Sequence, residues 1–200
     1  RVVFSETQIY HAAEITGNVS ARATDGLAMI ECDPVAVMPM PYALVEADSG
    51  ETTFADADGS YTLTVPDGAT TVMSELRGQW FHVINHGGAN AFLQQVVNAP
   101  GTADFVHNAP NSDFGTAEAN AYLHANLTRD YVLSIDPDFP VIGTETDFEI
   151  NVNLDFGPCV AFYADATINF SRAINPCRNM AMSTIIQHEY GHHLVTLSGG

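Results

Sequence analysis

The chain has 200 residues, of which 46% are apolar, so it can bury the core of one large domain or of two small ones. It carries 24 acidic residues against 6 basic ones, and its formal net charge is -18. Nucleic acids and anionic membrane surfaces are therefore disfavoured as partners, because both would repel this chain at long range. We interpret the acidity as a solvated surface.

The N-terminus and the three cysteines favour an exported protein. No apolar run approaches the ~18 residues of a membrane span, and residues 1–4 lack the order of a signal peptide, so we expect a mature or trimmed product. Cys159 and Cys177 each follow a proline, and a disulfide between them would contribute roughly 3 kcal/mol by closing a loop. Cys32 is then either a buried free thiol or the partner of a segment outside this chain.

The first part of the chain alternates short β-branched runs with turn signals, which is typical of a small β-sandwich. The turn signals are the Asp-, Gly- and Pro-rich stretches between these runs. The expected strands cover residues 14–20, 42–47, 51–54, 60–65 and 70–76, and a β-ribbon follows at 79–84 and 91–97.

From residue 115 the apolar period changes to that of a helix. Residues 116–133 contain neither Gly nor Pro, and Thr116 is the expected N-cap. The apolar stripe of this helix consists of Ala117, Ala121, Leu123, Leu127, Tyr131 and Val132.

Strands return after this helix. Residues 149–154 alternate strictly, which predicts a half-buried strand with Ile150, Val152 and Leu154 on its core face. Two shorter strands are expected at residues 160–163 and 167–170, and a final helix at about 180–197.

The final helix carries the pattern HExxH. His188 and His192 are four residues apart, so their imidazoles lie one turn above each other on the same helix face, as zinc requires of two ligands. Glu189 is rotated by about 100° from His188, where its carboxylate can reach a water on the metal. We therefore expect a zinc site in which Glu189 is the general base for peptide-bond hydrolysis.

The neighbouring His193 is not expected to be a ligand. It projects about 100° away from His192 and falls on the stripe of Glu189, so we interpret it as a support of the site or as a solvent-facing residue. The longer pattern HExxHxxGxxH also fails, since position 195 is Val195 and position 198 is Ser198. The third zinc ligand must come from elsewhere.

The helix at 120–131, the strand residues 151–154, 159–163 and 168–170, and the motif at 187–193 together resemble the N-terminal lobe of secreted gluzincins of the thermolysin and fungalysin type. The resemblance covers roughly residues 77–197. It implies that Ala161, Phe162 and Tyr163 lie on an edge strand that binds the substrate backbone, although the usual preceding asparagine is replaced by Val160.

In that family a glutamate on a later helix is the third zinc ligand. Only eight residues follow His192, and none is acidic. The resemblance therefore implies that the C-terminal remainder of a catalytic domain completes the site.

Residues 1–76 resemble a carboxypeptidase regulatory-like β-sandwich of the transthyretin type, through residues 17–19, 41–45 and 56–63. Such modules look like non-catalytic appendages. Asp56 and Asp58 could suggest calcium, but Gly59 is at the wrong loop position for a calcium loop, so a tight turn is the better interpretation.

These observations predict an α+β fold, with a transthyretin-like sandwich at 1–76 and an incomplete zincin N-terminal lobe at 77–200, truncated after the motif helix. Two functions remain open. In the first, the chain belongs to a secreted zinc endopeptidase that acts on proteins or peptides. In the second, it is a structural extracellular fragment that associates with itself or with a partner, and the zinc site is vestigial.

Overall fold

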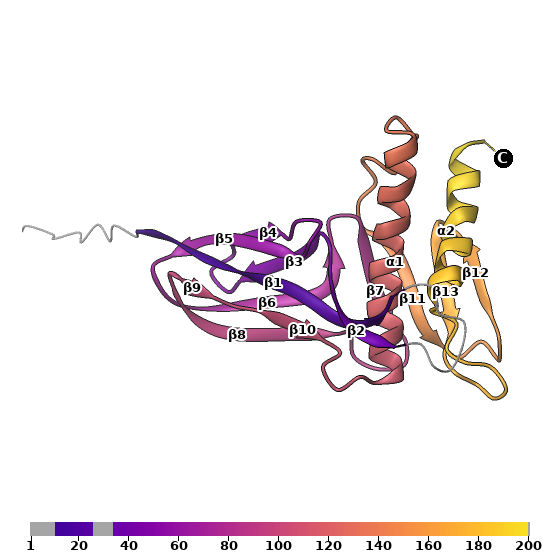
Figure 1. Cartoon of the computed structure of the whole chain (residues 1–200), viewed down its shortest axis with the longest axis horizontal. Coiled ribbons are helices and arrows are strands. Elements are labelled where there is room, and N and C mark those ends of the chain that lie inside the picture. The colour runs from indigo at the N-terminus through magenta and orange to yellow at the C-terminus, as the bar shows by residue number, and fades with distance from the viewer. Residues whose placement is uncertain (1–10, 26–33, 200) are drawn as a thin grey trace, which may run out of the picture.

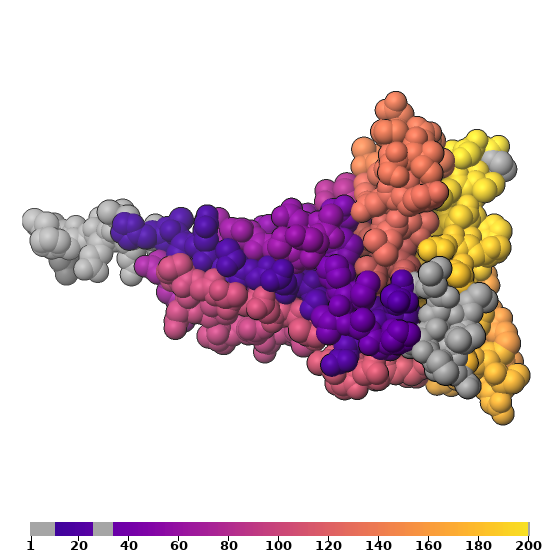
Figure 2. All heavy atoms as spheres, viewed as in Figure 1, coloured from indigo at the N-terminus to yellow at the C-terminus, as the bar shows by residue number. Residues whose placement is uncertain are grey.

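The structure is a computed structural model that describes residues 11–25 and 34–199. Its fold is mixed and mostly sheet, with two helices in the described part, which confirms the α+β class. Figure 1 shows the sandwich strands at one end of the molecule and both helices gathered at the other. In the space-filling view the sandwich is a narrow arm, and the molecule widens where the helices lie (Figure 2). Cys32 lies outside the described residues, so the expectation about its thiol stays a prediction.

One sheet of the sandwich is organised around β1 (Ala12–Thr24), whose residues alternate between buried and exposed positions. The buried positions include Ile15, Val19 and Ala21, which have no exposed surface. Four other strands pair with β1: β2 (Val35–Pro39) and β5 (Ser60–Pro66) antiparallel, and β9 (Gly101–Thr102) and β10 (Phe105–His107) parallel.

The second sheet runs through the whole molecule, from the sandwich to the helical end. Its strand order is β12 (Ala161–Ala164), β13 (Thr167–Ser171), β11 (Phe148–Leu154), β7 (Phe81–Asn85), β6 (Gly68–Gly78), β3 (Ala43–Ala47) and β4 (Thr52–Phe54). Strand β8 (Phe92–Ala99) belongs to the same sheet and pairs with β6, outside the order given above. Because β6 pairs with sandwich strands and, at Arg77, also with β7, the two ends of the molecule share one sheet.

The β-ribbon expected from residues 79–84 and 91–97 is wrong. Strand β8 pairs antiparallel with β6, from Gly68 opposite Ala99 to Glu75 opposite Phe92, whereas β7 pairs in parallel with β11. Strands β8, β9 and β10 therefore return to the sandwich. The domain division at residue 77 stays a prediction, and residues 92–107 lie with the part that precedes it.

Helix α1 (Asp113–Ile135) begins three residues before the expected start. Its N-cap is Ser112 rather than Thr116, since the Ser112 hydroxyl accepts a hydrogen bond from the Gly115 backbone N–H at 3.0 Å. In the second half of the predicted apolar stripe, Leu127 is 46% and Tyr131 66% exposed, whereas Val132 is partly buried against the core. In Figure 1 this half of α1 stands beyond the sandwich.

Strand β11 is covered on both faces, although strict alternation predicted a half-buried strand. Ile150 and Val152 are fully buried as expected, but Asn151 and Asn153 on intervening positions are buried too. Hydrogen bonds to polar side chains accompany this burial: Asn151 Oδ1 lies 2.6 Å from His86 Nε2, and the Asn153 amide donates to the Asn85 side chain at 2.9 Å.

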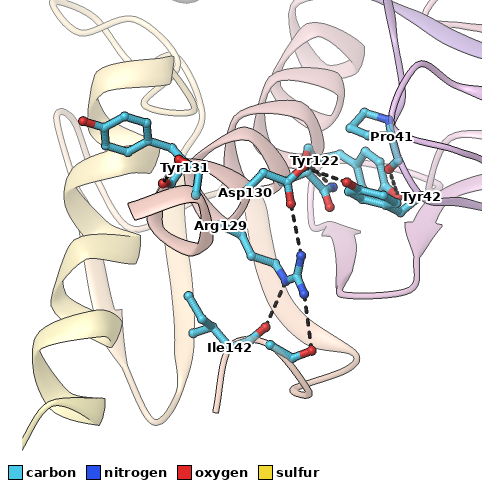
Figure 3. A network of polar contacts seen from close by, with 10 residues as sticks. Pro41, Tyr42, Tyr122, Arg129, Asp130, Tyr131 and Ile142 are labelled. Atoms are coloured by element: carbon cyan, nitrogen blue, oxygen red, sulfur yellow. Dashed lines mark hydrogen bonds and ion pairs between the residues drawn. The ribbon is translucent and has the colours of Figure 1, made fainter. Parts of the chain in front are cut away.

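Close contacts join the sandwich to α1 where the chain leaves β2. The buried Tyr122 hydroxyl donates to the carbonyl of Pro41 at 2.8 Å, and the Tyr42 hydroxyl donates to the Asp130 carboxylate at 2.8 Å (Figure 3). Burial and the Asp130 carboxylate raise the pKa of Tyr42 to about 12. Gly78 lies at the same junction, where any Cβ would collide with the Tyr122 hydroxyl and the Tyr42 carbonyl.

Next to this junction, Arg129 holds the segment between α1 and β11. Its guanidinium carbon lies 3.6 Å from the centre of the Trp80 ring, which is a stacked cation–π geometry. Its Nε donates to the Ile142 carbonyl at 2.9 Å, and a terminal nitrogen forms an ion pair with Asp130 at 3.1 Å (Figure 3). Arg129 is only 6% exposed, so these partners replace the water that its charge would otherwise keep.

We predict that Gly78→Ala lowers the free energy of unfolding by at least about 2 kcal/mol, because the added methyl group must displace backbone as well as a buried hydroxyl. Denaturant unfolding measures this. The control is Gly88→Ala, where a Cβ meets nothing within 4 Å and a change below about 0.5 kcal/mol is expected. Equal effects of the two substitutions would contradict the described junction.

A second prediction concerns His107 inside the sandwich, which is 1% exposed and lies 3.0 Å from the Ser74 hydroxyl. Burial lowers its pKa from 6.5 to about 4. Between these two values the unfolded chain takes up a proton that the folded chain does not. The contribution of His107 to the free energy of unfolding is therefore present above pH 6.5 and is lost as pH falls towards 4.

This group alone should remove about 3 kcal/mol of unfolding free energy between pH 7 and pH 4. The pH profile of His107→Gln should lack that part of the loss, whereas the exposed His11→Gln should follow the wild type. Identical profiles for His107→Gln and the wild type would contradict the prediction.

Candidate metal centre

The motif lies on α2 (Ser183–Leu197), where His188 and His192 are both exposed on one face. Their Nε2 atoms are 3.2 Å apart, and the ring centroids are 4.8 Å apart. Two imidazoles on a tetrahedral zinc ion, each with a Zn–N bond of about 2.0 to 2.1 Å, have nitrogens about 3.3 to 3.4 Å apart. The two side chains therefore already have the spacing of two ligands of one zinc ion.

Glu189 lies beside the pair on the inner side of the helix, where it is 6% exposed. One potential ligand atom from each of His188, Glu189 and His192 lies within 4.8 Å of the others. This is the group of metal-ligand side chains found in the described residues.

The donor set fits a borderline-soft ion such as zinc, since two imidazole nitrogens and a carboxylate oxygen are among its usual ligands. A metal ion bound here would be held by His188 and His192, which leave further coordination positions for other donors. The arrangement does not identify the ion.

Helix α2 is fixed by its buried face. Tyr190 is 1% exposed, and its ring makes edge contacts with Phe81 on β7 and Phe148 on β11, each at 5.4 Å between centroids. Before the helix begins, the Asn179 amide donates to the Asn153 side chain at 2.7 Å. This hydrogen bond joins the segment that precedes α2 to β11. The helix therefore presents its two histidines outward because the opposite face is held in the core.

His193 is buried, at 2% exposure, so the solvent-facing alternative for this residue is wrong. It shares the inner face with Glu189, as the helical period predicts, and it is not part of the metal-ligand group. Its Nε2 lies 2.8 Å from the Glu145 carboxylate and its Nδ1 lies 3.2 Å from the Tyr163 hydroxyl.

The strand predicted to bind substrate, β12, is the terminal strand of its sheet and pairs with β13. The Ser171 N–H donates to the Val160 carbonyl at 2.9 Å, so residues 160 and 162 are hydrogen-bonded to β13. By the antiparallel alternation, the backbone groups of Ala161 and Tyr163 point to the opposite edge, where no other described strand pairs. That edge can accept an extended peptide.

The structure contains the predicted disulfide Cys159–Cys177, with Cα atoms 5.3 Å apart. It spans the segment that contains β12 and β13, so it limits the movement of the edge strand. None of the helices among the described residues is long and apolar enough to cross a membrane. The calcium interpretation gains no support, because residues 56–59 form a turn in which the Gly59 N–H donates to the Asp56 carbonyl at 2.9 Å.

Sequence reasoning did not find Glu145, and it did not connect Tyr163 to His193. Glu145 lies in an irregular segment where no periodicity marks a functional carboxylate. The one available signal was His193 itself, because a histidine on the inner face of a helix needs polar partners.

Comparisons with known proteins identify no family. No protein-family model matches the chain, and no curated protein is significantly similar to it in sequence. One solved structure with detectable similarity is a 9R-lipoxygenase from Cyanothece PCC8801, at a TM-score of 0.23 and 14% identity. The match covers 68% of this chain and 27% of that chain, and similarity at this level carries no argument about function.

We predict that zinc binds the isolated chain through His188 and His192 and that His192→Ala weakens binding by at least ~10-fold, because one imidazole cannot replace a pair. Competition with a chromophoric chelator measures the dissociation constant. His11→Ala, which removes an exposed histidine from the sandwich end, is the control and should bind as the wild type does. Equal affinities for all three proteins would place the metal elsewhere.

Proposed function

We propose that this chain is the metal-binding lobe of a secreted zinc endopeptidase of the gluzincin type. The observation that carries the proposal is the 3.2 Å separation of the His188 and His192 Nε2 atoms, with the Glu189 carboxylate beside them. The resemblance of the motif helix and of β12 to thermolysin-like and fungalysin-like enzymes supports it. The transthyretin-like character of the sandwich belongs to the same proposal.

In this proposal His188 and His192 would hold the ion, which would act as a Lewis acid and lower the pKa of a bound water. Glu189 takes a proton from the water that attacks the peptide carbonyl. It then donates that proton to the amine nitrogen as the C–N bond breaks. Its low exposure, 6%, shields the carboxylate from bulk water during this transfer.

Strand β12 would bind the substrate by main-chain hydrogen bonds. The outward backbone groups of Ala161 and Tyr163 can pair with an extended peptide, and Phe162 between them presents its side chain to the other side of the strand. Pairing of this kind selects for an extended backbone and depends little on sequence, so the substrate class is proteins or peptides.

The third ligand is expected from a polypeptide that covers the exposed side of α2. An apolar groove lies between the two helices and is lined by Leu127, Thr128, Tyr131 and Val132 of α1 and by Gln187 of α2. The same groove favours the second candidate function, in which this chain is a structural element that associates with itself or with a partner, because large exposed apolar side chains mark association surfaces.

We predict that Glu189→Gln in the native full-length protein lowers kcat for protein hydrolysis by ~10²- to 10⁴-fold and leaves zinc content unchanged, because the amide cannot accept the proton. A fluorogenic peptide assay and metal analysis measure the two quantities. Glu14→Gln, an exposed carboxylate on β1, should retain wild-type kcat.

Full activity of Glu189→Gln would sink the endopeptidase proposal. Substoichiometric zinc in the wild-type protein, together with concentration-dependent association in sedimentation velocity, would instead favour the structural role.

A further inference from the structure

His193 follows the candidate metal ligand His192, and three parts of the chain meet at its side chain. The Glu145 carboxylate can only accept a hydrogen bond, so the proton between it and His193 belongs to Nε2 of the imidazole. In the neutral imidazole Nδ1 is then the acceptor, and the Tyr163 hydroxyl donates to it at 3.2 Å. One imidazole therefore links the α1–β11 segment, helix α2 and strand β12.

The His193 ring has little room to turn. It lies against Phe148 at 4.5 Å and against Tyr190 at 5.6 Å between centroids, and it is 2% exposed. With both nitrogens occupied and two neighbouring aromatic rings packed against it, its orientation is set by the fold.

The segment that carries Glu145 is itself held at several points. The Glu145 N–H donates to the Val141 carbonyl at 2.8 Å, and Arg129 binds the carbonyls of Ile142 and Gly143 at 2.9 and 3.5 Å. Arg129 in turn is stacked on Trp80. The backbone around Glu145 is therefore held by hydrogen bonds where its carboxylate meets His193. The Glu145 side chain is 22% exposed.

We propose that Glu145 is the positioning residue of the candidate metal centre: through His193 it fixes the separation between helix α2, with its ligands, and the open edge of β12. The inference rests on the proposed function. In that function, a peptide bond of a substrate on β12 must lie within reach of Glu189 and the metal, so the separation between α2 and β12 matters. A shift of 1 Å in such a geometry is costly for catalysis.

The test compares Glu145→Ala, Glu145→Gln and Asp138→Ala in the 200-residue chain. Asp138 is an exposed carboxylate in the same connecting segment, so its removal changes the net charge equally without touching His193. Gln keeps a side-chain oxygen that can accept a hydrogen bond from the Nε2–H group of His193. The two measurements are amide hydrogen exchange of β12 and α2, and the zinc dissociation constant at a temperature where every variant is folded.

For Glu145→Ala we expect faster exchange of the β12 amide of Phe162, which faces β13, and a zinc dissociation constant raised by about 10-fold, at the low end of effects of groups that support metal ligands. Glu145→Gln should stay within about 2-fold of the wild type, as the hydrogen bond is retained. Asp138→Ala should match the wild type in both measurements. Tyr163→Phe, which removes the other hydrogen bond of His193, should also speed exchange of β12 and serves if Glu145→Ala does not fold.

Unchanged exchange in Glu145→Ala would overturn the inference, and so would faster exchange with wild-type zinc affinity, because the contact would then be structural only. An equal effect of Asp138→Ala would overturn it as well, since charge alone would explain the change. A wild-type chain that binds no zinc would instead contradict the proposed function, whereas normal zinc binding by both wild type and Glu145→Ala would contradict this inference alone.

Discussion

The candidate metal centre depends on one constraint: the face of α2 opposite its two histidines is packed into the core. Tyr190 and His193 anchor the inner face among aromatic side chains of β7 and β11, while His188 and His192 stay outside with Nε2 atoms 3.2 Å apart. Glu189 lies on the inner face, beside the histidine pair. Its position lets one short helix supply both a ligand pair and a shielded carboxylate.

The anchoring extends back to the sandwich. Strand β6 belongs to both ends of the molecule, and the hydroxyls of Tyr42 and Tyr122 bind across the junction to Asp130 and Pro41. Arg129, beside Asp130, carries the connection to the segment of Glu145. The sandwich is therefore in direct contact with the residues that hold α2, and its role as a non-catalytic appendage stays a prediction.

Local patterns predicted most strands, both helices, the disulfide and the ligand spacing, because alternation and helical period are properties of adjacent residues. What they could not predict was non-local. Whether β8 pairs with β6 or β7 depends on distant chain segments, and β9 and β10 are too short to show a period. A stripe also cannot reveal that Leu127 and Tyr131 stay exposed in the folded chain. Glu145 sits in an irregular segment, so only the folded chain brings it to His193.

The central claim is that one ion is bound between two imidazoles of α2, and X-ray absorption spectroscopy of the zinc-loaded chain tests it most directly. The account predicts two imidazole nitrogens at about 2.0 to 2.1 Å, with their characteristic multiple-scattering pattern, and oxygen atoms in the remaining positions. The imidazole pattern should be lost in a His188→Ala, His192→Ala double variant. A spectrum with oxygen ligands alone, or an unchanged spectrum in the double variant, would contradict the account.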